Sequence, residues 1–248
     1  MIDVIELESC GSTNTYLAGI SGELERDTVV VAREQTAGRG QRGNSWEASS
    51  GLNVTCSLLM FNRRGIKAAE QFVISEAVSL GIVDTLRRFL GDVSEEVKVK
   101  WPNDIYVGDR KICGILIEHS ISNREINRSI IGIGINVNQR EFVSDAPNPV
   151  SLFNLINREV AVDDVLRNAV EDIYSRLESP GSEIHRAYNS ELWRKDGNRY
   201  IDASTGERFH ARIADVLPDG TLCLVDEAFN ERRYLFKEVA VDMIAGES

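Results

Sequence analysis

Residues 97–118 read VKVKWPNDIYVGDRKICGILIE, and this stretch predicts the centre of the fold. Apolar and basic residues alternate at period two before Pro102, which is typical of a β-strand. Proline then ends the ladder because it has no N–H. A second strand follows, and Gly108-Asp109 is a two-residue hairpin signal before the chain returns into an apolar run. The stretch therefore predicts a β-hairpin with polar and charged residues at one end.

The predicted hairpin brings chemically active side chains together. We expect Asn103, Asp104, Arg110 and Lys111 to lie close in space. Gly114 leaves the returning strand bare, as where a ligand or another backbone approaches. Charged groups rooted on apolar strands are typical of a site for a charged small molecule. An ordinary solvated surface hairpin explains the same stretch equally well when it is considered alone.

Composition bounds the class of protein. The chain has 248 residues, of which 42% are apolar, and this suits one large domain or a domain with a small appendage. A net charge of −11 argues against broad nucleic-acid binding, so positive charge for an anion must be local. The four cysteines form no CxxC pair, which argues against structural zinc and a disulfide framework. With no signal peptide and no apolar run of about 20 residues, we expect a cytoplasmic protein without a membrane partner.

Two stretches near the N-terminus carry polar residues without apolar periodicity. Ser12, Thr13 and Asn14 resemble a helix start, and capping alone would explain them. Residues 33–51 form a long segment between strands expected over 28–32 and 52–58. Loops longer than about 12–15 residues are usually functional or disordered. Glycines and arginines interleave in this loop, as suits an anion, although flexible loops share this composition and no GxxxxGK[ST] pattern is present.

The remaining chain predicts helices, one more buried strand and a small β unit. Amphipathic helices are expected over 66–90, 163–177 and 184–193. Residues 130–138, IIGIGINVN, predict a buried strand whose glycines let a ligand lie flat and whose end carries Asn136. A dinucleotide fingerprint would need a third glycine, and a satisfied core asparagine is the other interpretation.

Short strands with turn signals follow residue 195. They predict domains over 1–195 and 196–248.

Five motifs, taken together and in order, resemble the biotin protein ligases. They are STN at 12–14, QTAGRGQRGNSW at 35–46, KWPNDI at 100–105, RKICGILIE at 110–118 and GIGINVN at 132–138. The resemblance implies an α+β fold: a class II synthetase-like biotin/lipoate ligase domain with a mixed β-sheet and flanking helices, then a small C-terminal SH3-like β-barrel. It also implies the catalytic type without an N-terminal DNA-binding domain, so no nucleic-acid partner is expected.

The resemblance implies an ATP-dependent ligase that works in two steps. Biotin and ATP, with Mg²⁺, form biotinyl-5′-AMP and pyrophosphate. The biotinyl group then moves to one lysine of a biotin carboxyl carrier protein domain of a carboxylase. Members of the family include monomers and homodimers, so both oligomeric states stay open.

Site residues follow from the same resemblance. The catalytic set is Lys111, Arg39 and Asp104. The ureido ring of biotin is expected to face Ser12, Thr13, Asn14 and Gln35. The loop that closes over biotin and the adenylate comprises Gly38, Arg39, Gly40, Gln41 and Arg42, with Trp46 packing over the closed site. The ATP and magnesium side is expected to include Asn103, Asp104, Gly114 and Asn136. No metal ligand is assigned.

One position departs from the family pattern. Many members read GRGRxG, and here Gln41 stands at the second arginine. A glutamine keeps hydrogen bonding but not charge, which predicts a looser hold on the adenylate unless Arg42 compensates.

Two other functions fit parts of the pattern. A lipoate or octanoate ligase would carry RRxxGGG followed by histidine, which is absent. A non-catalytic biotin-sensing module predicts loss of Lys111 or of the KWPND turn, and both are present.

Overall fold

The computed structural model of the chain describes residues 2–40, 45–143 and 148–242. Its elements, in chain order, are β1 (Asp3–Cys10), α1 (Thr13–Ile20), β2 (Thr28–Gln35), β3 (Val54–Phe61), η2 (Ala68–Glu70), α2 (Phe72–Leu90), η3 (Gly91–Glu96), β4 (Val97–Lys100), β5 (Asp104–Val107), β6 (Arg110–Ser122), β7 (Glu125–Ile135), α3 (Leu152–Ile156), α4 (Val162–Glu178), α5 (Gly181–Ser190), β8 (Asn198–Asp202), β9 (Arg208–Val216), β10 (Leu222–Asp226), β11 (Glu231–Tyr234) and β12 (Val239–Val241).

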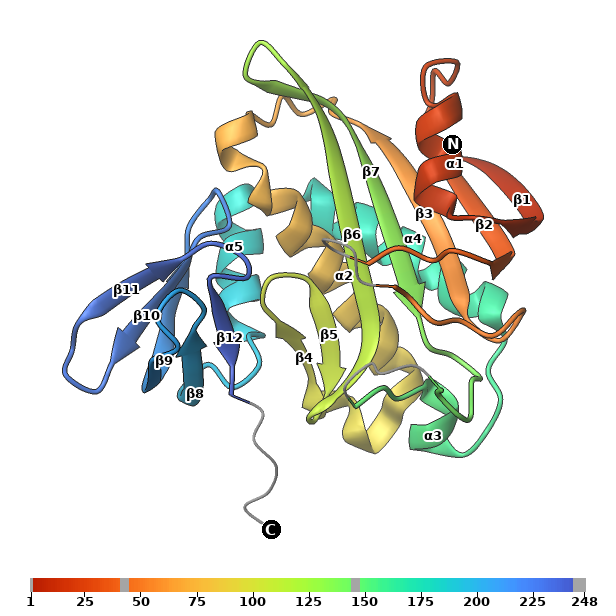
Figure 1. Cartoon of the computed structure of the whole chain (residues 1–248). Coiled ribbons are helices and arrows are strands. Elements are labelled where there is room, and N and C mark those ends of the chain that lie inside the picture. Colours follow the sequence, from red (N-terminus) through yellow and green to blue (C-terminus); the bar gives the residue numbers. More distant parts are fainter. Residues whose placement is uncertain (1, 41–44, 144–147, 243–248) are drawn as a thin grey trace.

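Seven strands form one mixed sheet in the order β1-β2-β3-β7-β6-β5-β4 (Figure 1). β1 and β2 are parallel, and every other neighbouring pair is antiparallel. Val107 pairs with Arg110, so Gly108-Asp109 is the predicted two-residue turn. Gly108 takes a φ of 58°, a left-handed conformation that glycine adopts without strain. The sequence prediction for the hairpin is therefore confirmed.

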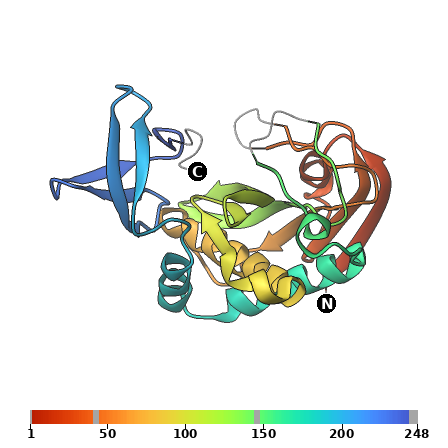
Figure 2. The same ribbon diagram turned by 90° about the horizontal axis from the view of Figure 1, so that it is seen from below.

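The two faces of this sheet are covered differently. Helices α2 and α4 pack on one face, and α1 lies on the other (Figure 2). Leu58 of β3 and Ile131 of β7 belong to the larger core, which α2 and α4 share. Their neighbours Leu59 and Ile130 pack instead with Leu17 of α1. This alternation follows from the period of a strand, in which successive side chains point to opposite faces.

Helix α2 begins later than predicted. The expected helix over 66–90 starts at Phe72 instead, although it ends at Gly91 as expected. The reason is that the Asn62 side chain bonds both the N–H and the C=O of Ile66, and Ala68 N–H donates to Arg124 O at 3.0 Å. These bonds tie the segment to the β6–β7 hairpin, and its backbone is not available for a helix.

Helix α5 also differs from the predicted 184–193, because it covers Gly181–Ser190. Residues 191–193 leave the helix to pair with the edge strand β4: Val99 N–H donates to Glu191 O and Trp193 N–H donates to Val99 O, both at 2.8 Å. The prediction for α4 holds to within one residue at each end.

The C-terminal strands form a second, antiparallel sheet in the order β11-β10-β9-β8-β12. Its all-β character is confirmed, but the expected closed barrel is not: in the described part of the chain, β11 and β12 stand at opposite edges and no ladder joins them. The sheet packs beside the main domain, where Trp101 Nε1 donates to Gly220 O at 3.0 Å. A domain boundary at 195/196 stays a prediction. No helix in the described ranges is long and apolar enough to cross a membrane.

Candidate active site

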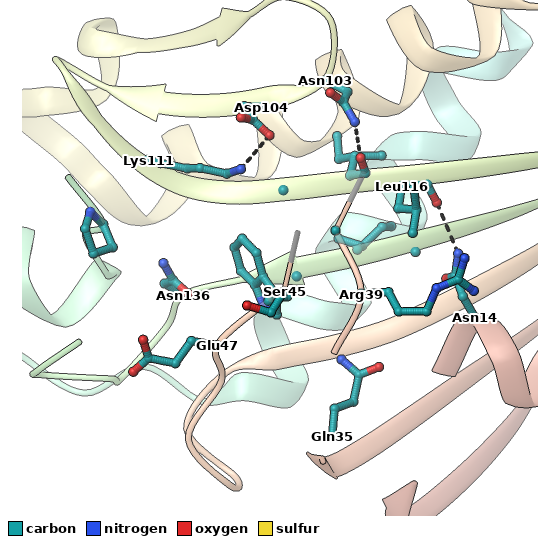
Figure 3. A pocket seen from close by; sticks show the side chains of 18 of the residues that line it. Asn14, Gln35, Arg39, Ser45, Glu47, Asn103, Asp104, Lys111, Leu116 and Asn136 are labelled. Carbon is teal, nitrogen blue, oxygen red and sulfur yellow. Dashed lines mark hydrogen bonds and ion pairs between the residues drawn. The ribbon is translucent and has the colours of Figure 1, made fainter. Parts of the chain in front are cut away.

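A cavity of about 730 Å³ opens on the α1 side of the central strands (Figure 3). Most of the residues singled out from the sequence line it: Ser12, Thr13, Asn14, Gln35, Arg39, Gly40, Trp46, Asn103, Asp104, Lys111, Gly114 and Asn136. Gly38 is not a lining residue, although its carbonyl accepts a hydrogen bond from Trp46 N–H at the base of the glycine–arginine loop. Gln41 and Arg42 lie outside the described residues. Arg110, expected beside Lys111, is exposed and does not line the cavity.

Glycines form the floor of this cavity. Gly114 of β6 pairs with Gly134 of β7, and Gly132 stands two residues before Gly134, so all three share one face of the sheet. A Cβ at Gly132 would overlap the Asn14 amide, and one at Gly134 would overlap the Trp46 indole. At Gly114 a Cβ would lie 2.9 Å from Trp46 Cζ3. The bare strands therefore admit side chains, and by extension a flat ligand, directly onto the backbone.

One end of the cavity is a buried cluster of neutral polar groups at the start of α1. Thr13 donates to Gln35 Oε1 through its backbone N–H at 2.7 Å and its hydroxyl at 3.1 Å. Ser57 Oγ donates to Thr13 Oγ1 at 2.7 Å and also bonds Asn14 Oδ1. Ser12 precedes the helix but makes no side-chain capping bond, so capping does not explain its presence. The head-end cluster, as we call these residues, joins three segments that are distant in sequence.

Sequence reasoning missed Ser57 and Glu118. Ser57 is fully buried within β3, and a hydroxyl inside so apolar a strand is the signal that could have revealed it. Glu118 accepts from Asn14 Nδ2 at 2.9 Å and from Arg39 Nη2 at 3.1 Å. Arg39 also reaches Thr15 at 3.3 Å, so it points toward α1 (Figure 3). Glu118 thereby bridges the head-end cluster and the glycine–arginine loop.

The opposite end of the cavity is charged. Lys111 Nζ lies 2.7 Å from Asp104 Oδ1 and 5.6 Å from the ring centroid of Trp46. The backbone of Lys111 is fixed from both sides, because its N–H donates to Asn148 O at 2.8 Å and its C=O accepts from Val150 N–H at 2.9 Å. Residues 148–150 were not predicted to take part, since they lie far along the chain and carry no charged side chain.

Asparagines secure the strands around this charged end. Asn103 Nδ2 donates to Ile115 O and fixes the KWPND turn on β6. Asn136 Nδ2 donates to Val150 O at 3.0 Å, while its Oδ1 is buried without a protein partner. Asn136 therefore combines both interpretations offered by the sequence: half of its amide is satisfied in the core, and the residue lines the cavity.

A second lysine, which sequence reasoning did not select, also lines the charged end. Lys100 Nζ donates to Tyr106 OH at 3.0 Å and lies 4.8 and 5.4 Å from the ring centroids of Tyr106 and Trp193. Burial lowers the pKa of Lys100, and the charge of Asp104 opposes that shift. Lys100 and Lys111 thus bring positive charge to a cavity that the carboxylates of Asp104 and Glu47 also line.

The glycine–arginine loop closes at its neck over this floor. Trp46 N–H donates to Gly38 O at 3.0 Å, and Arg39 and Ser45 form an isolated bridge. A Cβ at Gly38 would lie 2.5 Å from the Trp46 carbonyl oxygen, so this position admits no larger residue. The neck places the Trp46 indole in the cavity between its two ends.

Comparison with known proteins identifies the family. The model of the biotin/lipoate A/B protein ligase family matches residues 7–136. The chain belongs to this family. It is 36% identical to the bifunctional ligase/repressor BirA of Escherichia coli over 137 residues, which are 55% of this chain and 41% of that protein. It is 35% identical to the biotin–[acetyl-CoA-carboxylase] ligase of Paracoccus denitrificans over 126 residues, 51% of each chain. The matched region thus spans about half the length of these relatives or less.

Solved structures of this family share the fold. The biotin protein ligase from Aquifex aeolicus in complex with biotin and ATP superposes with a TM-score of 0.76 at 22% identity, covering 96% of this chain and 98% of that chain. The biotin protein ligase from Leishmania major in complex with biotinyl-5-AMP gives a TM-score of 0.66 at 20% identity, covering 94% and 98%. The predicted ligase fold is therefore confirmed. The superposed region includes the C-terminal sheet.

Proposed function

We propose that the protein is a biotin protein ligase, which activates biotin with ATP to biotinyl-5′-AMP and transfers the biotinyl group to a lysine of a carrier protein. One observation carries the proposal. A single cavity has a neutral hydrogen-bonding cluster at one end and a lysine–aspartate pair at the other, with a bare glycine floor between them. Biotin has this same polarity, with a neutral ureido ring at one end and a carboxylate at the other.

The head-end cluster suits a ureido group. A neutral polar group leaves water at a cost unless its donors and acceptors are paired. Ser12, Thr13, Asn14 and Gln35 supply hydroxyl and amide groups that both donate and accept. Ser57 adds a hydroxyl behind them. The ureido group of biotin offers N–H and C=O groups to these side chains, whereas an apolar ring offers none, which disfavours a lipoate ligase.

The charged end suits adenylate formation. Biotin's carboxylate is ionised at neutral pH, because carboxyl groups have a reference pKa near 4. One of its oxygens attacks the α-phosphorus of ATP, the bond to the bridging oxygen breaks, and pyrophosphate leaves. No proton has to be removed, but two anions must meet. Lys111 supplies fixed positive charge for this step, and Arg39 adds more when it leaves Glu118 for the ligand.

Magnesium is implied by the use of ATP. The described residues contain no cluster of three or more His, Cys, Asp or Glu side chains, which fits an ion held mainly by phosphate oxygens and one or two carboxylates. Asp104 is the carboxylate at the charged end that would hold it, beside Asn103. When bound, the ion neutralises charge on the phosphates.

Transfer requires an unprotonated acceptor lysine. Its amine attacks the carbonyl carbon of the adenylate, the bond to the phosphate oxygen breaks, and AMP leaves. Asp104 is our candidate to orient the amine or accept its proton, provided that the carboxylate exchanges its bond to Lys111 for one to the amine. The loop residues Gly38 to Arg42, with Trp46, would exclude water from the reactive adenylate.

The proposal extends to partners. The acceptor would be a biotin carboxyl carrier domain of a carboxylase, met at the open charged end. We propose no nucleic-acid or membrane partner, a cytoplasmic location, and a monomer or homodimer.

The experiment is transfer of labelled biotin to an apo carrier domain in the presence of ATP. We expect labelling of the carrier lysine that requires both ATP and this protein. Biotin binding without any transfer would favour the non-catalytic sensing module instead. Labelling by lipoate or octanoate but not biotin would favour the related lipoate ligases.

A further inference from the structure

Gln139 lies just beyond β7, outside the cavity, and its side chain is almost completely buried, with the residue only 1% exposed. All four hydrogen-bonding positions of its amide are used. Oε1 accepts from Ser49 N–H at 3.0 Å and from Asn53 Nδ2 at 2.6 Å. Nε2 donates to Glu47 Oε1 at 2.9 Å and to Glu141 O at 3.0 Å. Gln139 takes no part in the proposed reaction.

The partners fix one orientation of this amide. Those facing Oε1 are donors, and those facing Nε2 are acceptors, so a flipped amide would oppose like groups on both sides. Asn53 continues the network, because its Oδ1 accepts from Val137 N–H at 2.9 Å. The buried chain Glu47–Gln139–Asn53 thus ties the segment after Trp46 to the end of β7.

Trp46 immediately precedes this anchored segment. Its indole lies on Gly114 and Gly134, and its ring stands 5.6 Å from Lys111 Nζ. The neck bond to Gly38 holds Trp46 from the N-terminal side of the loop, and Gln139 holds the following residues from the C-terminal side. The backbone on both sides of the indole is therefore fixed before a ligand arrives.

We propose that Gln139 is a positioning residue that fixes residues 47–49 to β7 and so holds Trp46 over the glycine floor. The inference rests on the proposed function for the identity of the ligand. Without Gln139, residues 47–49 would become ordered only when the ligand binds. The free energy of this ordering would then weaken ligand binding. Chemistry in the fully occupied site is unchanged, because Gln139 touches neither Lys111 nor Asp104. The expected signature is a raised KM for biotin with kcat nearly constant.

The chain contains a matched control at the other end of β3. Asn62 follows β3 as Asn53 precedes it, and its amide bonds the N–H and C=O of Ile66 and the carbonyl of Ile126 at 2.7–3.0 Å. It is an amide clamp of the same kind on the same strand, away from the cavity. Replacing either amide with leucine removes the bonds at similar volume, so both variants lose stability but only one loosens the loop.

The experiment compares Gln139→Leu with Asn62→Leu in the full chain. In biotin-dependent exchange of pyrophosphate into ATP, Gln139→Leu should raise KM for biotin about tenfold, with kcat within about twofold of the wild type. Asn62→Leu should leave both constants unchanged. Amide hydrogen exchange, measured by NMR without ligand, should accelerate at Ser49 and Trp46 only in Gln139→Leu, and at Ile66 only in Asn62→Leu.

An unchanged KM in Gln139→Leu, or equal increases in both variants, would overturn the inference. If the wild type shows no biotin-dependent pyrophosphate exchange, the proposed function has failed. Amide hydrogen exchange in Gln139→Leu and Asn62→Leu still tests the role of Gln139 separately. Unaltered exchange at Trp46 in Gln139→Leu would then refute the positioning role.

Discussion

The two ends of the cavity are built in opposite ways. Ser12, Thr13 and Asn14 at the head end are between 3% and 6% exposed, and Thr13 and Asn14 bond partners within the protein. At the charged end the Lys111 and Asp104 side chains remain 26% and 29% exposed and are bonded to each other. The head end can thus take a neutral group without breaking an ion pair, whereas the charged end must exchange an internal ion pair for its ligand.

The largest effect should follow removal of the charge at Lys111. Lys111→Ala should slow adenylate formation by about a thousandfold, because its charge acts where two anions meet. Biotin binding should persist, since the head-end cluster is untouched. Pyrophosphate exchange and calorimetric titration with biotin measure the two effects separately. Wild-type exchange in this variant would remove Lys111 from the chemistry.

A methyl group added to the glycine floor at Gly132 should disturb the head-end cluster instead. Gly132→Ala should weaken biotin binding roughly tenfold to a hundredfold, since the new Cβ displaces Asn14 and overpacking costs about 1–3 kcal/mol. Gly134→Ala is the matched control, because its Cβ meets Trp46 instead. That variant should release the adenylate faster, and its loss of biotin affinity should stay smaller than that of Gly132→Ala because the head-end cluster is intact. Equal losses of biotin affinity in both would contradict the division into two ends.

A smaller effect is expected at Arg39, the loop residue that pairs with Glu118 beside the head-end cluster. Arg39→Ala should raise KM for biotin about tenfold through loss of a charged contact. Its exposed pair with Glu118 contributes only about 0–1 kcal/mol to folding, so thermal stability should hardly change. Steady-state kinetics and a melting curve check the two parts. Unaltered kinetics would place Arg39 outside the site.

The smallest effect should come from a cluster remote from both ends. His185 bonds Glu76 at 2.8 Å and Asp215 at 3.1 Å, joining α2 and α5 to the C-terminal sheet. Burial lowers the pKa of His185, but the bonds and charges of these carboxylates outweigh it and raise the pKa above its usual value.

A folded-state pKa above the unfolded value near 6.5 gives stability that is present below that pH and lost as the pH rises through the folded pKa. The melting temperature of the wild type should therefore exceed that of His185→Gln by more at pH 6 than at pH 8.5, by a few degrees at most because the histidine is partly exposed. A gap that is constant with pH, or a changed KM for biotin, would refute this assignment.

The features that could be predicted from the sequence are those that depend on local residue patterns. Alternation in residues 97–118 and the Gly108-Asp109 turn identified the hairpin that carries Asp104 and Lys111. The glycines of β6 and β7 indicated a bare surface, because they interrupt apolar strands at period two. Family resemblance then supplied the ends of the cavity.

The features that could not be predicted depend on contacts between segments that are distant in the sequence. Ser57, Glu118 and Gln139 each bond at least one partner between 43 and 104 residues away. The predicted start of α2 was wrong for the same reason, since the N–H of Ala68 bonds Arg124 of the distant β6–β7 hairpin. The β-barrel expected at the C-terminus is found as an antiparallel sheet, because short strands predict a β unit but not how its edges pair.

The most direct test of the central claim is exchange of labelled pyrophosphate into ATP, with biotin, lipoate and octanoate as parallel substrates. We predict exchange that depends on biotin and is absent with the other two acids, since only biotin pairs the head-end cluster while presenting a carboxylate to Lys111. Exchange with lipoate or octanoate in place of biotin, or no exchange despite tight biotin binding, would contradict the account.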